Sequence, residues 1–178
     1  MFGLLEGKNV NLRIVEKEDL PLLTEWFNTP EFSGEFMWWP QKSRMEREKE
    51  YDNPPPDSRT FFIEKEDGAK IGWIGHFLFG NLLEIFYSLL PSERKKGYCS
   101  EAVMIMVGYL FLSRELVRIQ ATTDVNNLAS QRVLEKAGFK KEGTIRRSAF
   151  IRGKWRDGCL FSILREEWKE PKILTKTA

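Results

Sequence analysis

The longest apolar run of the chain, residues 102–112, lies between two segments with strand character. Residues 82–90 before it and 117–123 after it are rich in the β-branched, aromatic and aliphatic side chains that fit a half-buried pleated surface. A helix that is apolar on nearly every side must be buried against another layer of the fold. The run therefore predicts a strand–helix–strand crossover, with a helix at about 100–112, inside a mixed sheet.

Alternating elements continue on both sides of this crossover without any repeat. Helices are predicted from periodicity and capping residues at 18–28, 42–51 and 128–137. Strands are predicted at 10–15, 60–65 and 70–79, and a long hairpin at 140–164 turns at residues 152–154. The predicted fold class is therefore α/β (α+β), with a mixed, mostly antiparallel sheet of about seven strands flanked by about four helices.

Length and charge exclude several classes of protein. The 178 residues fit one domain, 1–178, and the net charge of +2 gives no reason to expect nucleic acid or a membrane as the main partner. The single histidine, His76, and the widely spaced Cys99 and Cys159 match neither a metal site nor a disulfide framework. With no signal-peptide pattern and no apolar run long enough to span a bilayer, we expect a soluble cytoplasmic protein without a metal ion.

A basic, glycine-containing turn leads from the 82–90 strand into the apolar helix. Its residues are Arg94, Lys95, Lys96, Gly97, Tyr98, Cys99 and Ser100. A turn that opens a helix leaves backbone N–H groups without partners, and the helix dipole favours an anion there. The segment predicts a phosphate-binding cradle, although a solvated basic loop would look similar.

A second segment, Asn127 to Phe139, opens the next helix with an amide and a hydroxyl, Asn127 and Ser130, and ends it at Gly138. Asn127 is a natural helix N-cap, and Gly138 is a natural helix stop. Together with the basic turn about thirty residues earlier, however, this pattern resembles the acyl-CoA-binding core of the GNAT superfamily of N-acetyltransferases. Nearly the whole chain resembles the RimJ/RimL-like branch, which includes ribosomal-protein N-terminal and spermidine acetyltransferases.

The resemblance implies a GNAT-type fold with acetyl-CoA as co-substrate. Residues 94–100 would bind its pyrophosphate through backbone amides, and Asn127 would bind the pantetheine arm. Leu89 or Leu90 would supply a backbone N–H to the reaction's oxyanion. Cys99 stands where the family usually has glycine or alanine. We expect it to replace alanine as a small residue, but an acyl-accepting nucleophile is a second possibility.

Acetyl transfer to an amine also needs a base and an acid. Glu84 is the one acidic residue of the strand 83–90, and a carboxylate among apolar neighbours can serve as a general base. Ordered water in that role and a surface ion pair for Glu84 remain open. In many relatives a tyrosine seven residues after the motif asparagine acts as the general acid, and this chain has Leu134 at that position. In the resembling branch a serine, here Ser130, takes that role, and its alternative is helix capping.

The acceptor amine is the least determined part of the prediction. Phe36, Trp38 and Trp39 lie in the segment that borders the acceptor site in the resembling family, although aromatic side chains also fill cores. We expect a protein N-terminus as acceptor, with a polyamine, aminoglycoside or amino acid as alternatives. A non-catalytic CoA-binding module is the alternative of another class, and a homodimer is possible.

Overall fold

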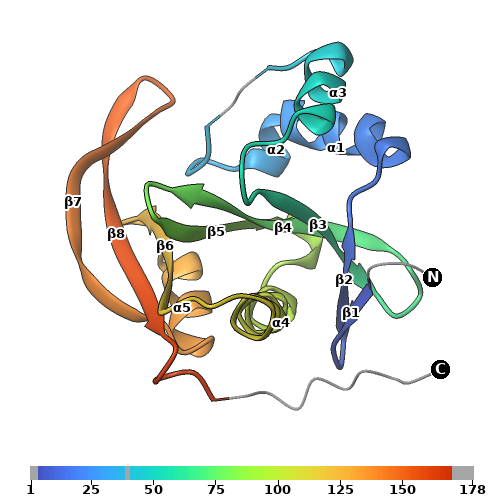
Figure 1. Cartoon of the computed structure of the whole chain (residues 1–178). Helices are drawn as coiled ribbons and strands as arrows, with labels where there is room; N and C mark the ends of the chain where they lie inside the picture. Colours follow the sequence, from blue (N-terminus) through green and yellow to red (C-terminus); the bar gives the residue numbers. More distant parts are fainter. Residues whose placement is uncertain (1–3, 39–40, 170–178) are drawn as a thin grey trace.

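The computed structural model describes residues 4–38 and 41–169. One eight-stranded mixed sheet runs through the molecule in the order β1-β2-β3-β4-β5-β6-β8-β7 (Figure 1). Its pairs are antiparallel except for β5 with β6, which are parallel and joined by the predicted crossover helix. The strands are β1 (Leu4–Glu6), β2 (Val10–Ile14), β3 (Arg59–Lys65), β4 (Lys70–Phe79), β5 (Leu82–Leu89), β6 (Arg118–Asp124), β7 (Lys140–Ile151) and β8 (Lys154–Leu164).

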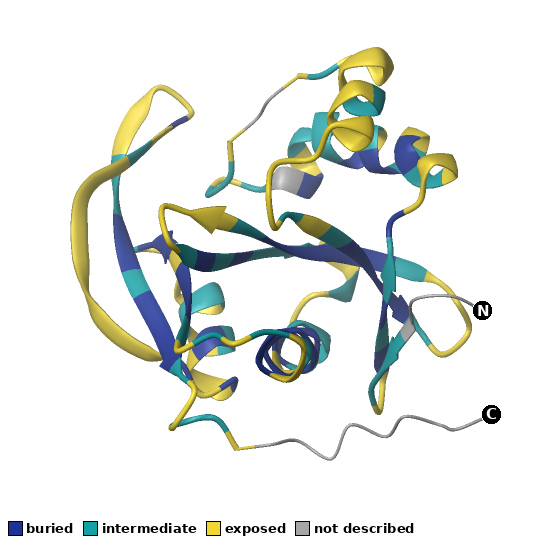
Figure 2. Ribbon diagram, in the orientation of Figure 1, coloured by how far each residue is buried: buried dark blue, intermediate teal, exposed yellow. Residues whose placement is uncertain are grey.

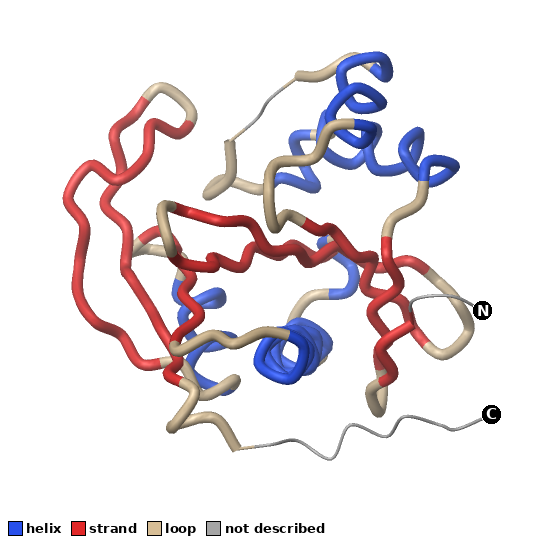
Figure 3. Tube along the Cα trace, viewed as in Figure 1, coloured by secondary structure: helices blue, strands red, loops and turns tan. Residues whose placement is uncertain are grey.

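Helices cover both faces of the sheet (Figures 1 and 3). One face carries the crossover helix α4 and α5, and the other carries the three N-terminal helices. Two short 3-10 turns, Lys17–Asp19 and Pro91–Glu93, precede α1 and Arg94 respectively. The α-helices are α1 (Leu20–Asn28), α2 (Pro30–Ser33), α3 (Arg44–Asp52), α4 (Tyr98–Ser113) and α5 (Leu128–Lys136).

Apolar side chains form one cluster on each face of the sheet. The larger cluster contains most of α4 and, from β5, Leu83, Ile85 and Leu89. The smaller cluster is built from α1, α2, Phe62 of β3 and Trp73 of β4, and Phe86 of β5 packs against it. Burial is therefore deepest in the central strands and α4, as the apolar run predicts (Figure 2).

The β7–β8 hairpin extends beyond the helical layers and curls toward α2 (Figure 1). Its register shifts between Ile145 and Ala149, and Arg147 in that bulge has a positive φ of 50°. The Arg147 N–H donates to Asp157 Oδ1 at 2.8 Å, which fixes the bulge. Because a bulge bends its strand, the hairpin tip reaches α2, where Arg152 donates to the Pro30 carbonyl at 3.3 Å.

The fold confirms the predicted class and corrects its details. Eight strands and five α-helices are present in the described residues, because β1 and the one-turn α2 lack a periodic pattern long enough to predict. The predicted helix 100–112 begins two residues earlier, at Tyr98. No helix in the described part of the chain is long and apolar enough to cross a membrane.

Candidate active site

The two parallel strands β5 and β6 pair over only two residues. Their register joins Leu83 to Ile119 and Glu84 to Gln120, after which β5 continues along β4 and β6 continues along β8. The sheet therefore opens beyond Glu84 into a gap between the two strands. This is the parting of strands that the family resemblance requires beside the acyl donor.

Backbone donors of β5 face this gap at alternate residues. The Leu90 N–H donates to the Ile71 carbonyl at 2.9 Å, so Leu90 is paired with β4. In an antiparallel ladder the neighbouring residue directs its N–H the opposite way. Tyr87 and Leu89 consequently present their N–H groups to the gap. Of the two predicted oxyanion donors, Leu89 fits the role and Leu90 does not, because its N–H is already bonded.

The turn before α4 has the backbone of an anion cradle. Gly97 is the N-cap of α4 with a φ of +88°, and Lys95 has a φ of +65°. The N–H groups of Tyr98, Cys99 and Ser100 belong to the first helical turn and have no intrahelical acceptor. A Cβ at Gly97 would meet no atom within 4 Å, so this backbone is open to a ligand.

The basic side chains of the turn do not all face the cradle. Arg94 donates through Nε to the Leu89 carbonyl at 3.0 Å and through Nη2 to the Phe32 carbonyl at 3.1 Å. Lys96 pairs with Glu93 at 3.1 Å. Arg94 therefore ties the end of β5 to α2, and its positive charge still acts on Cys99 at the start of α4.

Cys99 is a poor candidate for an acyl-accepting nucleophile. Its side chain packs against the core cluster under α4, and burial raises the pKa of the thiol to about 12 although Arg94 partly opposes the shift. The thiolate is the reactive form of cysteine, and it is scarce at neutral pH with such a pKa. Cys99 instead packs as a small, partly buried residue against the core.

Asn127 caps α5 as its sequence position predicts. Its Oδ1 accepts a hydrogen bond from the Ser130 N–H at 3.1 Å, which leaves the amide Nδ2 for other partners. The Ser130 hydroxyl lies 2.9 Å from the hydroxyl of Tyr87 on β5. Leu134, at the position of the usual tyrosine, is fully buried in the core.

Sequence reasoning missed Tyr87. Tyr87 lies on the same face of β5 as Leu83, Ile85 and Leu89, which point toward α4. This spacing of two residues was the signal that could have placed it there. Burial raises the pKa of its hydroxyl above the ordinary range for tyrosine.

Glu84 lies on the opposite face of β5 from Tyr87. Its Oε2 accepts a hydrogen bond from Gln120 Nε2 at 2.9 Å, at the last paired rung before the gap. Within residues 4–38 and 41–169, no ion pair includes Glu84, and its carboxylate accepts from an uncharged amide.

Of the three aromatic residues predicted to border the acceptor site, Phe36 and Trp38 differ in their surroundings. The Arg156 guanidinium on β8 lies 5.5 Å from the ring centre of Phe36 and pairs with Asp124 at 3.2 Å. Trp38 is 64% exposed, so it belongs to the surface and not to the core. Trp39 lies outside the described residues.

Comparisons with known proteins agree with this geometry. Residues 9–140 match the family model described as "Acetyltransferase (GNAT) domain". The chain is 35% identical over 130 residues to the probable N-acetyltransferase YjcK of Bacillus subtilis (strain 168), covering 71% of this chain and 68% of that one.

Solved structures that share the fold include two bound to coenzyme A. A spermidine N-acetyltransferase from Vibrio cholerae in complex with CoA and spermine has a TM-score of 0.81, at 22% identity, over 90% of this chain and 98% of that one. RimL, a ribosomal L7/L12 alpha-N-protein acetyltransferase in complex with coenzyme A, has a TM-score of 0.78, at 16% identity, over 90% and 97%. The chain belongs to the GNAT acetyltransferase family and is an N-acetyltransferase that uses acetyl-CoA.

Proposed function

We propose that this enzyme transfers the acetyl group of acetyl-CoA directly to the primary amine of a protein N-terminus, with both substrates bound together. The parting of β5 and β6 carries the proposal, because it leaves the Leu89 N–H without a partner strand on the side of the gap, one short turn before α4. An acyl donor laid along the end of β5 would have an anion cradle at one end and an oxyanion donor at the other.

The cradle would hold the pyrophosphate through main-chain groups. The free N–H groups of Tyr98, Cys99 and Ser100 would supply donors, and Lys95 would add positive charge beside them, whereas Lys96 is paired with Glu93. The pantetheine arm would follow the gap, where the Asn127 Nδ2 and the outward backbone of β5 offer amide partners. This arrangement would place the thioester near Leu89.

The reaction then needs one proton removed and one supplied. The neutral amine attacks the thioester carbon, and the Leu89 N–H stabilises the oxyanion. Glu84 precedes Leu89 by five residues of extended strand, a span of about 16 Å, so it would take the amine proton through intervening water. When the C–S bond breaks, sulfur keeps the bonding electrons and the Ser130 hydroxyl protonates it.

Charge on the acceptor side favours a peptide over a polyamine. Arg152 and Arg156 lie against the segment 30–36, through the Pro30 carbonyl and the Phe36 ring. The Arg152 guanidinium would repel the several cationic centres of a polyamine, whereas the charge of Arg156 is already paired with Asp124. Both guanidinium groups are also suitable donors to the carbonyl groups of a peptide.

The acceptor is tested by measuring thiol release from acetyl-CoA with paired substrates. Peptides with free N-termini are compared with the same peptides N-acetylated, and with spermidine, an aminoglycoside and free amino acids. We expect release only with the free peptides. Release with spermidine or another small amine in place of peptides would refute the acceptor assignment while leaving the transfer chemistry intact.

Glu84 has a local test. The Glu84→Gln variant keeps an acceptor oxygen for Gln120 but removes the base, so kcat should fall and the acidic limb of the pH–rate profile should disappear. Glu135→Gln, an exposed site on α5, is the matched control and should retain the profile. An unchanged profile in Glu84→Gln would rule out Glu84 as the base and leave water in that role.

A further inference from the structure

The Tyr87 side chain reaches from β5 across to α5, the helix that follows β6. The Tyr87 hydroxyl, on β5, lies 2.9 Å from Ser130 Oγ and 3.3 Å from the Ser130 carbonyl oxygen, in the first turn of α5. The bond lies on the α4 face, below the Tyr87 and Leu89 N–H groups that face the gap. It therefore sits where the departing sulfur is expected.

The surroundings of Tyr87 keep its hydroxyl protonated. Burial raises the pKa of Tyr87, and the nearby titratable group from α4 is the Cys99 thiol, whose pKa is itself raised. From α5, the facing group is the Ser130 hydroxyl, which lowers the pKa of Tyr87 but is outweighed by burial. Tyr87 is consequently a neutral phenol with one hydrogen to donate at the pH of any ordinary assay.

That single hydrogen allows two arrangements. If Tyr87 donates to the Ser130 carbonyl, the 2.9 Å bond must be donated by the Ser130 hydroxyl, whose hydrogen is then occupied. If Tyr87 donates to Ser130 Oγ instead, the Ser130 hydrogen is free to point elsewhere. Only the second arrangement lets Ser130 act as an acid.

We propose that Tyr87 is a positioning residue that donates its hydrogen bond to Ser130 Oγ and so directs the Ser130 hydroxyl toward the departing CoA sulfur. The inference rests on the proposed function, in which Ser130 is the acid. Tyr87 occupies β5 across the gap, whereas the position of the family's usual tyrosine is the buried Leu134. The phenol thus acts through Ser130 and not on the sulfur itself.

The protons balance without ionising Tyr87. As the C–S bond breaks, the Ser130 O–H bond breaks and an S–H bond forms, which leaves negative charge on Oγ. The Tyr87 hydrogen bond stabilises that charge. A water molecule then returns a proton to Oγ, and the hydroxide formed is neutralised by the proton that the amine released through Glu84.

Single-turnover acetyl transfer tests this inference with three variants. Tyr87→Phe, Ser130→Ala and the double variant are compared at saturating acetyl-CoA, and CoA affinity is measured separately. We expect Tyr87→Phe to slow transfer by about 10- to 100-fold, near the lower range for loss of acid catalysis, with CoA affinity unchanged. Adding Tyr87→Phe to Ser130→Ala should cause no further loss, because the phenol acts only through the serine.

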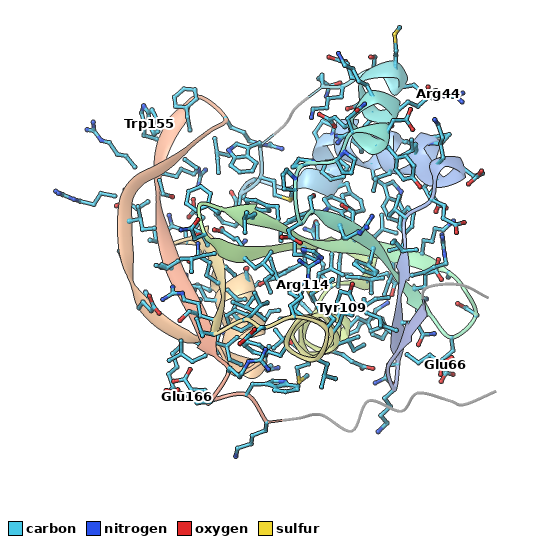
Figure 4. The ribbon with its side chains drawn as sticks, in the orientation of Figure 1. Arg44, Glu66, Tyr109, Arg114, Trp155 and Glu166 are labelled. Carbon is cyan, nitrogen blue, oxygen red and sulfur yellow. The ribbon has the colours of Figure 1, made fainter. Side chains whose placement is uncertain are left out.

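Tyr109→Phe is the matched control. Tyr109 is a half-buried tyrosine on α4 (Figure 4). Its ring packs edge-on against that of Phe61, with 5.7 Å between the ring centres. The Tyr109→Phe variant should transfer acetyl groups at the rate of the unmodified protein. If Tyr87→Phe slows transfer equally with and without Ser130, or merely weakens CoA binding, the positioning role is overturned while the enzyme's function stands. If the unmodified protein transfers no acetyl group, both proposals fail together.

Discussion

Replacing Gly97 by alanine separates the cofactor cradle from the stability of the fold. At a φ of +88°, an alanine costs about 1–2 kcal/mol through its Cβ, although that Cβ meets no atom of the free protein within 4 Å. For a chain of this size the penalty corresponds to a Tm lower by about 2–8 °C. The same Cβ would stand where the pyrophosphate approaches, and loss of one charge-assisted hydrogen bond would weaken CoA binding by about tenfold or more.

Gly68→Ala provides the matched comparison. Gly68 has a φ of +80° in the β3–β4 turn, and a Cβ there also meets no atom within 4 Å. Differential scanning calorimetry should show similar losses of Tm in both variants, whereas isothermal titration with CoA should show weaker binding in Gly97→Ala alone. Equal CoA affinity in the two variants would refute the assignment of the cradle.

Two further predictions concern buried titratable groups. His76 is fully buried with Nδ1 against the Asp57 carbonyl, and desolvation lowers its pKa to about 4. His76 binds a proton more tightly in the unfolded chain than in the folded one. The free energy of unfolding is therefore highest above pH 6.5 and falls by about 3 kcal/mol as the pH is lowered toward 4. Urea unfolding across this range should show the loss in the natural protein and a smaller one in His76→Gln; equal slopes would contradict it. Cys99→Ala should retain acetyl-CoA thiol release with free peptides, and abolished turnover with normal CoA binding would restore the nucleophile hypothesis.

The sequence predicted what local patterns determine. The apolar run in α4 required burial on nearly all sides, so the crossover was foreseeable, and Gly97 permits the positive φ found at the start of that helix. Asn127 was predicted as a cap from its place before α5, and the structure confirms it. These features depend on residues close together in the chain.

Contacts between distant segments were not predictable in the same way. The basic residues next to Arg94 in the sequence suggest a phosphate ligand, but its guanidinium donates hydrogen bonds to backbone carbonyls of β5 and α2. The backbone N–H groups of Leu89 and Leu90 point to opposite sides of β5, and which one faces β4 depends on the register between the two strands. The Tyr87–Ser130 bond joins residues 43 positions apart and exists only because β5 and β6 part.

The central claim is tested most directly by following free CoA and acetylated product together in one reaction of acetyl-CoA with a peptide bearing a free N-terminus. The account predicts one thiol released for each peptide acetylated at its α-amine, as located by fragmentation mass spectrometry. Tight CoA binding without thiol release on any peptide or small amine would contradict it.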